Sequence, residues 1–280
     1  MMKILVTGAN GYIGRHAVKA LLEKGHTVIA VGRQLDQVDA RATKIIADIF
    51  NLPEDPFNTW HQPDALLHLA WQDGFIHNAS SHIEGLPKHL RFVQSLVDAG
   101  LQQVIVMGSM HEVGFYEGQI NEETPCRPTS FYGIAKNSLR QALDVYLKDK
   151  AVSFQWLRAF YIVGDDASNH SIFTKILEKE RQGDASFPFT DGQAQYDFIR
   201  IEDLAEQIAT VAEQKEVVGI IHCCSGTPVR IKDAVEAFLS EHQLNIKPAY
   251  GTFPTRPYDS KIIYGDNAKI KRLMEQAHVE

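Results

Sequence analysis

The sequence has few cysteines and no long apolar segment. Its 280 residues include three cysteines, of which Cys223 and Cys224 are adjacent. An odd number with one adjacent pair does not make a disulfide framework, which indicates a reducing compartment, and we expect the cytoplasm. The apolar run after Met1 is too short for a secretion signal, and no later run is long enough to cross a membrane. We therefore expect no membrane association, and we expect no metal site.

The sequence also lacks an excess of positive charge. It contains 28 Lys and Arg against 35 Asp and Glu, a formal net charge of −7. A mildly acidic chain has no bulk attraction for a phosphate backbone, so nucleic acid is not an expected partner. A ligand that carries phosphate must instead be held by local donors. Hydrophobic residues make up 44%, which is enough for the core of one large domain or two small ones.

Strand-like and helix-like segments alternate through the first half of the sequence. The expected strands are Lys3–Thr7, Thr27–Val31, Lys44–Ala47, Ala65–Ala70, Gln103–Met107, Ser153–Leu157 and Gly219–Cys223. The expected helices are Tyr12–Lys24, His89–Ala99, Thr129–Leu147, Ser171–Arg181, Glu202–Glu213, Lys232–Glu241 and Asn267–Gln276. Continuously apolar strands that alternate with helices predict an α/β fold, a doubly wound parallel sheet buried on both faces. After about residue 160 the pattern becomes mixed α and β, with proline-containing loops.

A glycine-rich turn joins the first expected strand to the first expected helix. Its three glycines are spaced G-x-x-G-x-x-G. Glycines permit a tight turn and let backbone N–H groups approach a pyrophosphate, while the helix N-terminus adds partial positive charge. At this place in the chain the pattern predicts a dinucleotide site. The expected contacts are Gly8, Asn10, Gly11, Tyr12, Ile13 and Gly14.

The end of the second expected strand bears on the type of dinucleotide. An acidic residue there accepts hydrogen bonds from a ribose 2′-hydroxyl, whereas an arginine accommodates a 2′-phosphate. The strand ends in Val31-Gly32-Arg33, and the first acid after it is Asp36. Arg33, with Arg15 as a second basic contact, favours NADP(H) over NAD(H). A hydrogen bond from a ribose to Asp36 would restore NAD.

Tyr132 and Lys136 lie four residues apart on an expected helix, so both project from one face. A tyrosine with a pKa of about 10 is a poor acid or base at neutral pH, and a nearby ammonium lowers that pKa. Tyr132 can then exchange a proton with a carbonyl oxygen while hydride moves at the adjacent carbon, and Lys136 can hydrogen-bond the nicotinamide ribose. Such a pair about 120 residues after a phosphate turn predicts a nicotinamide-dependent oxidoreductase.

These motifs make the chain resemble the extended short-chain dehydrogenase/reductase family of nucleotide-sugar epimerases, dehydratases and reductases, over nearly its whole length. The resemblance implies that Asp48-Ile49 meets the adenine and that His68-Leu69-Ala70-Trp71 passes under the cofactor. It adds Leu69, Ala70, Trp71 and Tyr161 to the expected cofactor site, and it places Arg256 at a nucleotide diphosphate. Three further groups of residues resemble segments of the family. They are Leu157-Arg158 with Gly164; Gly192 with Asp197-Phe198 and Asp203-Leu204; and Arg256-Pro257-Tyr258-Asp259 with Asp266 and Leu273.

The resemblance also divides the chain into two parts. We expect an NAD(P)-binding Rossmann domain over residues 1–160, to which a later part of about 194–224 returns. A smaller, mixed α/β substrate-binding lobe is expected over residues 161–280.

The third catalytic position of the family is a Ser or Thr on the loop after the fifth strand. Here that loop contains Ser109, 23 residues before Tyr132. Alignment on Glu112 and the residue after it puts Met110 in this position instead. We favour Ser109, because Met cannot donate a hydrogen bond to a substrate oxygen. The alternative is that Ser109 only caps the loop and a water molecule takes its place.

Several departures from the family pattern bear on the reaction. Relatives that eliminate water carry Thr-Asp-Glu where this chain has Met110-His111-Glu112, which argues against a 4,6-dehydratase. His111 is then an auxiliary acid or a structural donor. Tyr161 replaces the usual Asn and Tyr196 the usual Arg, so Arg256 and backbone groups must bind more of the diphosphate. The expected substrate contacts are Trp71, Ser109, His111, Tyr196 and Arg256.

The resulting hypothesis is an NADP(H)-dependent reductase of a nucleotide-activated 4-keto-6-deoxy sugar, in which C4 receives the hydride and Tyr132 protonates the oxygen. A nucleotide-sugar epimerase that retains bound NAD is the alternative. A non-catalytic NADP(H)-sensing or binding protein is a third, disfavoured because both Tyr132 and Lys136 are present. The expected partner is a nucleoside-diphosphate sugar, and the resemblance suggests a homodimer formed by helix pairing.

Overall fold

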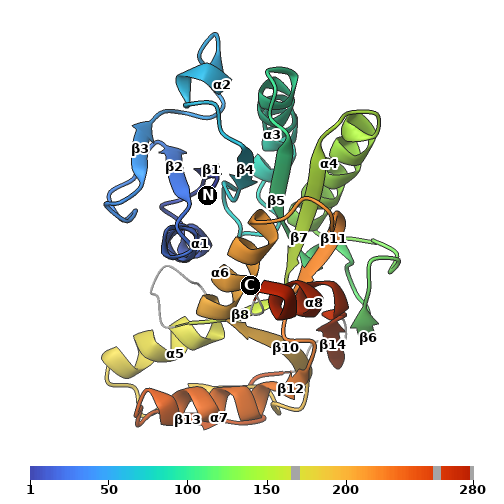
Figure 1. Cartoon of the computed structure of the whole chain (residues 1–280). Helices are drawn as coiled ribbons and strands as arrows, with labels where there is room; N and C mark the ends of the chain where they lie inside the picture. The colour runs from blue at the N-terminus through green and yellow to red at the C-terminus, as the bar shows by residue number, and fades with distance from the viewer. Residues whose placement is uncertain (165–170, 255–259, 278–280) are drawn as a thin grey trace.

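Seven strands form one parallel sheet in the computed structural model, which describes residues 1–164, 171–254 and 260–277 (Figure 1). In spatial order they are β11 (Gly219–Cys223), β7 (Ser153–Ala159), β5 (Gln103–Ser109), β4 (Ala65–His68), β1 (Lys3–Thr7), β2 (Thr27–Gly32) and β3 (Thr43–Ile46). The strand order reverses between β1 and β4, the switch point at which ligands bind in doubly wound sheets. The expected Rossmann-type α/β fold is thereby confirmed.

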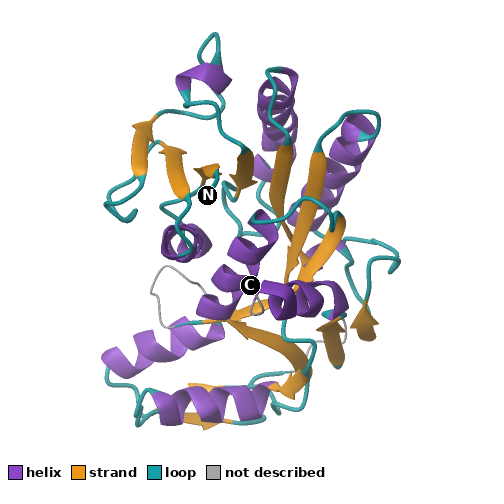
Figure 2. Ribbon diagram, in the orientation of Figure 1, coloured by secondary structure: helices purple, strands orange, loops and turns teal. Residues whose placement is uncertain are grey.

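Helices cover both faces of this sheet (Figure 2). Successive side chains of a strand point to opposite faces. In β1, Ile4 and Val6 pack into the core with two of the helices, whereas Leu5 packs into a second core with the other two. The helices on the Ile4 side are α1 (Tyr12–Glu23) and α6 (Ile201–Ala212), and those on the Leu5 side are α3 (Ser81–Asp98) and α4 (Phe131–Leu147). The short α2 (Pro56–Thr59) contacts α3, and α8 (Ala268–Ala277) packs against α6.

A second, smaller lobe lies beyond the carboxyl ends of β7 and β11, in the lower part of Figure 1. Its main sheet contains β12 (Pro228–Arg230), β10 (Gln195–Arg200), β14 (Ile262–Gly265), β6 (Gly118–Ile120) and β8 (Tyr161–Val163). A separate core joins α5 (Ile172–Arg181), α7 (Ile231–Glu241), β9 (Ser186–Pro188) and β13 (Lys247–Ala249). The chain leaves this lobe along α6 and β11 to rejoin the large sheet. The division into a cofactor domain and a substrate lobe stays a prediction.

The helix α3 differs most from the sequence-based expectation, because it begins at Ser81 rather than at His89. Its early turns contain Gly85 and Pro87, two residue types with low helix propensity. The tertiary contacts of the buried His82 oppose that local preference.

Most strands of the smaller lobe were not expected either, because they are short and pair with segments far away in the sequence. β6 pairs with β14, for example, about 140 residues later.

Two further observations bear on the first expectations. The three cysteines are free thiols, with Cys223 and Cys224 buried. Among the helices of the described ranges, none is both long enough and apolar enough to cross a membrane.

Candidate active site at the end of the parallel sheet

The glycine turn after β1 forms a close-packed cradle. The N–H of Gly11 donates to the carbonyl of Gly8 at 3.0 Å, and Gly8 has a φ of +71°, which favours glycine. A Cβ atom on Gly14 would overlap the Gly8 carbonyl, and one on Gly8 would lie 2.5 Å from the Ala70 nitrogen. The turn therefore depends on missing side chains, as a backbone site for a pyrophosphate requires.

A cleft of about 890 Å³ opens from this turn along the carboxyl ends of β1, β2 and β4. Of the expected cofactor residues, those that line it are Gly8, Asn10, Gly11, Arg33, Asp48, Ile49, Leu69, Ala70 and Trp71. Tyr12, Ile13 and Gly14 form the first turn of α1 next to it. The size and lining of the cleft, together with the glycine cradle, fit a dinucleotide.

Trp71 connects this cleft to the expected catalytic pair. Its indole N–H donates to Nδ1 of His82 at 3.0 Å, and its ring stacks on His89 with centroids 4.4 Å apart. The ammonium of Lys136 lies 3.9 Å from the indole centroid, and the ring of Tyr132 meets the indole edge-on at 6.3 Å. Tyr132 and Lys136 are thus at the end of the cleft, although they do not line its main volume.

Lys136 is almost completely buried, with 3% of its surface exposed. Its Nζ donates to the carbonyl of Met107 at 2.6 Å. Burial lowers the pKa of Lys136 to about 7, against the opposing charge of Glu112. The ammonium and the neutral amine are therefore both accessible forms near neutral pH.

Tyr132 lies in the first turn of α4, where its backbone N–H donates to the carbonyl of His77 at 2.9 Å. Burial raises the pKa of Tyr132 to about 12, opposed by a hydrogen bond with the Ser109 side chain and reinforced by the charge of Glu112. The expected lowering of this pKa by Lys136 is not found, because the Lys136 ammonium faces a carbonyl and an indole. The phenol is protonated in this state and can serve as a proton donor.

Ser109, rather than Met110, is directed toward Tyr132. The Ser109 hydroxyl accepts from the N–H of His111 at 3.3 Å and caps a short 3₁₀ turn, η1 (Met110–Glu112). Met110 is 5% exposed and packs into the core of the smaller lobe. The structure thus brings Ser109 to the phenol and also uses it as a cap, and the catalytic role of Ser109 stays a prediction.

Histidines surround the phenol, and sequence reasoning identified only one of them. The ring of His77 is parallel to that of Tyr132 at 5.3 Å, and His111 meets His77 edge-on at 4.5 Å. Burial lowers the pKa of His111 to about 4 and also lowers that of His77. Both rings are therefore neutral at physiological pH, which suits hydrogen bonding better than acid catalysis.

A second histidine pair lies beneath the cleft. Thr7 Oγ1 hydrogen-bonds Nδ1 of His68 at 2.7 Å, and Nε2 of His68 hydrogen-bonds Nδ1 of His89 at 2.8 Å. Burial lowers the pKa of His68 well below its usual value and that of His89 to about 3. The helix α3 contributes His82 and His89 to this region. The only sequence signal for this is their seven-residue spacing, which puts both on one helix face.

Two expected site residues lie elsewhere, and a third is outside the part of the chain that the structure describes. Tyr161 and Tyr196 stack on each other with centroids 4.6 Å apart, on β8 and β10 of the smaller lobe. They pack against the apolar core around Phe160 and Ile263 and do not line the cofactor cleft. Arg256 lies outside the described residues.

Comparison with known proteins places this geometry in context. Residues 4–223 match the model of the NAD dependent epimerase/dehydratase family. The dTDP-6-deoxy-L-talose 4-dehydrogenase (NAD(+)) of Aggregatibacter actinomycetemcomitans is 46% identical over 269 residues, covering 94% of this chain and 99% of that protein. The UDP-glucose 4-epimerase of Corynebacterium glutamicum is 26% identical over 260 residues, covering 84% of this chain and 79% of that protein.

Solved structures show the same fold. The UDP-glucuronic acid 4-epimerase of Bacillus cereus, in complex with UDP-glucuronic acid and NAD, superposes with a TM-score of 0.78 at 23% identity, covering 98% of this chain and 93% of that chain. The UDP-glucose 4-epimerase of Thermotoga maritima with UDP-glucose gives a TM-score of 0.79 at 22% identity, covering 97% and 92% respectively.

The expectation of NADP(H) is wrong, because the relative with 46% identity is an NAD(+) enzyme by name. That expectation depended on Arg33, whose side chain is exposed at the rim of the cleft. Asp36 lies beside the phosphate turn, where its carboxylate accepts from Nδ2 of Asn10 at 3.2 Å. Arg15, the second basic contact, donates instead to Gln37 at 2.7 Å.

Proposed function

The chain belongs to the NAD dependent epimerase/dehydratase family, and we propose that it is an NAD(H)-dependent oxidoreductase acting at C4 of a dTDP-linked 6-deoxyhexose. The expected resemblance to extended short-chain dehydrogenases/reductases is thereby confirmed at the level of the family. The observation that carries the finer proposal is the 46% identity to a dTDP-6-deoxy-L-talose 4-dehydrogenase over 99% of its length. The protonated phenol of Tyr132 beside Ser109 supports it.

Bound NAD(H) supplies the acceptor or donor for the hydride at C4. The backbone of the glycine turn would hold its pyrophosphate, Asp48 and Ile49 its adenosine, and Lys136 its nicotinamide ribose. In the direction of reduction, the Tyr132 hydroxyl gives its proton to the C4 oxygen as hydride reaches C4. In the direction of oxidation, the phenol first releases its proton to solvent, and the resulting phenolate would take the C4 hydroxyl proton as hydride leaves C4. Ser109 positions the C4 oxygen by a hydrogen bond.

The proposal predicts a simple assay. The purified protein, given dTDP-6-deoxy-L-talose and NAD+, should produce NADH and the 4-keto sugar in equal amounts, measured by absorbance at the NADH band and by mass spectrometry. In the reverse direction, NADH should be consumed with the 4-keto sugar. A change of configuration at C4 without net NADH would contradict the proposal and identify an epimerase instead. No reaction with any dTDP-6-deoxyhexose would reject it.

A homodimer remains a further proposal. The exposed apolar side chains Ile83 on α3 and Ile134 and Val145 on α4 support pairing of these helices between two copies. Light scattering should then give twice the mass of one chain, and Ile134→Lys should halve it. A single-chain mass for the unaltered protein would contradict this.

A further inference from the structure

The buried carboxylate of Glu112 lies directly beneath the loop that contains Ser109. The proposed reaction at C4 does not use it. Glu112 has no exposed surface. Its Oε1 accepts from the backbone N–H of Ser109 at 2.7 Å, and both carboxylate oxygens lie 3.0 Å from the indole nitrogen of Trp156. Its Oε2 accepts from Nη2 of Arg158 at 3.1 Å. Three donors therefore converge on one carboxylate, and their directions fix its orientation.

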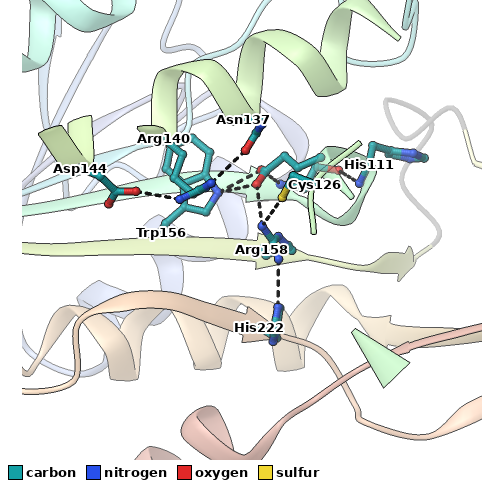
Figure 3. Close-up of polar contacts among 10 residues, drawn as sticks. His111, Cys126, Asn137, Arg140, Asp144, Trp156, Arg158 and His222 are labelled. Carbon is teal, nitrogen blue, oxygen red and sulfur yellow. Dashed lines mark hydrogen bonds and ion pairs between the residues drawn. The ribbon is translucent and has the colours of Figure 1, made fainter. Parts of the chain in front are cut away.

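Arg158, itself fully buried, extends the contacts to His222 on β11 (Figure 3). Its Nη1 lies 3.3 Å from Nε2 of His222. An arginine can only donate, so Nε2 must accept, and Nδ1 then carries the proton and donates to the carbonyl of Asp266 at 3.2 Å. Burial lowers the pKa of His222 to about 4, helped by the charge of Arg158, so the ring is neutral as this arrangement requires.

The backbone around Glu112 is shaped to admit this cluster. A Cβ atom on Gly108 would overlap the Trp156 indole and lie 2.5 Å from Oε1 of Glu112. A buried ion pair seldom increases stability over an apolar replacement, because both charges lose hydration. What this carboxylate does hold in place is Ser109, whose backbone N–H donates to it.

We propose that Glu112 is a positioning residue for the reaction proposed above: its carboxylate, held by Arg158, Trp156 and through Arg158 by His222, keeps the Ser109 loop in the conformation that presents the hydroxyl to Tyr132. Glu112 itself does not exchange protons with substrate, since it is sealed from the cleft. This inference rests on the proposed function only for its kinetic consequences.

The charge of Glu112 has a second consequence at Lys136. The groups that face Lys136 are Glu112 on η1, His68 on β4, His89 on α3, Tyr132 on α4, and Trp71 and the Met107 carbonyl. Within the described part of the chain, Glu112 is the residue whose charge raises the pKa of Lys136 against the effect of burial. Removal of that charge should shift the titration of Lys136 to lower pH.

The test is Glu112→Gln, with Gln155→Met as the matched control. The glutamine offers one acceptor oxygen to three donors and turns its NH₂ toward one of them, so the loop must shift. Gln155 lies on the same strand as Arg158, is equally buried, and donates to the Gln214 carbonyl at 3.0 Å. It pairs with Ile105, four residues before Ser109 on β5. Its loss should reduce stability without changing the kinetics.

We expect Glu112→Gln to lower kcat on the order of 10²-fold, the effect of a small misplacement of a catalytic group, with little change in the affinity for NAD+. The limb of the kcat/KM profile that reports Lys136 should move to lower pH. In a double-mutant cycle with Ser109→Ala, the two losses should be strongly non-additive. Additive losses, or a kcat equal to that of Gln155→Met, would overturn the proposal.

Hydrogen exchange provides a readout that needs no substrate. The Ser109 amide should lose protection in Glu112→Gln and keep it in Gln155→Met. If the unaltered protein does not turn over the sugar, the proposed function fails while this measurement still decides the role of Glu112. Retained protection would reject the inference even if turnover were found.

His222, which contacts Arg158, provides an independent test if Glu112→Gln does not fold. His222→Gln keeps an acceptor for Arg158 and a donor for Asp266, whereas His222→Leu keeps neither. We expect His222→Leu to lower kcat and expose the Ser109 amide, and His222→Gln to restore both. Equal behaviour of the two variants would contradict a positioning role for this chain of contacts.

Discussion

The two ends of the cofactor cleft are built by different means. At the phosphate end the backbone makes the site, and Gly8, Gly11 and Gly14 serve it by having no side chain. At the catalytic end buried side chains make the site, and the chemistry of Tyr132 and Lys136 depends on pKa values set by burial. Substitutions at the phosphate end should therefore change the affinity for NAD+. Substitutions at the catalytic end should change turnover, proton transfer and stability.

The sharpest way to separate the two ends is Tyr132→Phe. Loss of the proton donor should reduce kcat on the order of 10³-fold, while calorimetry should show an unchanged affinity for NAD+. Tyr146→Phe, on the same helix but hydrogen-bonded to Asp98 at the protein surface, is the control and should retain turnover. Substantial turnover in Tyr132→Phe would remove Tyr132 from the mechanism.

Lys136→Met should show that the buried lysine at the catalytic end lowers the stability of the folded protein. The pKa of Lys136 is about 7 in the folded protein, against 10.5 for an ordinary lysine. The cost of burying its charge is therefore fully present below pH 7 and is relieved as the pH rises toward 10.5. The methionine variant should therefore be more stable by about 2–4 kcal/mol at pH 6, and the gain should shrink toward pH 10. Urea unfolding at both pH values measures this. A gain that does not depend on pH would contradict the buried, shifted lysine.

Gly14→Ala tests the phosphate end. The added methyl overlaps the Gly8 carbonyl, and overpacking of about 1–3 kcal/mol should weaken NAD+ binding by about tenfold to a hundredfold. The kcat at saturating NAD+ should change much less. Gly74→Ala is the control, because nothing lies within 4 Å of its added Cβ. A lower kcat with an unchanged affinity for NAD+ in Gly14→Ala would contradict the proposed difference between the two ends.

The smallest effect is expected for Asp36→Ala. If Asp36 accepts a hydrogen bond from the ribose of NAD+, its loss should cost about 1.5 kcal/mol, or about tenfold in NAD+ affinity. The preference for NAD+ over NADP+ should then become smaller. Asp39→Ala, which removes a nearby carboxylate that pairs with Arg41, serves as the control. Titration of both variants with NAD+ and NADP+ gives the comparison. If Asp36→Ala left the ratio of the NAD+ and NADP+ affinities unchanged, Asp36 would not be the residue that selects NAD+ over NADP+.

The predictions from sequence were best where the signal is local. The glycine spacing after β1 and the four-residue spacing of Tyr132 and Lys136 each specify a geometry within one turn or one helix face. The order of apolar strands and helices was sufficient for the parallel sheet, because such crossovers have few solutions. The cofactor preference failed because it depended on two arginines: the side chain of Arg33 is exposed near a loop tip, and Arg15 donates to Gln37 instead.

The amino-acid sequence by itself determined the doubly wound sheet, the glycine turn and the pairing of a tyrosine with a lysine on one helix, since each follows from neighbours along the chain. Only the tertiary structure decided that burial raises the pKa of Tyr132, that His77 and His82 pack around its ring, and that Glu112 is buried beneath Ser109. The physical reason is that burial and hydrogen-bond partners come from strands and helices distant in sequence, and these set the pKa values and orientations on which the chemistry depends.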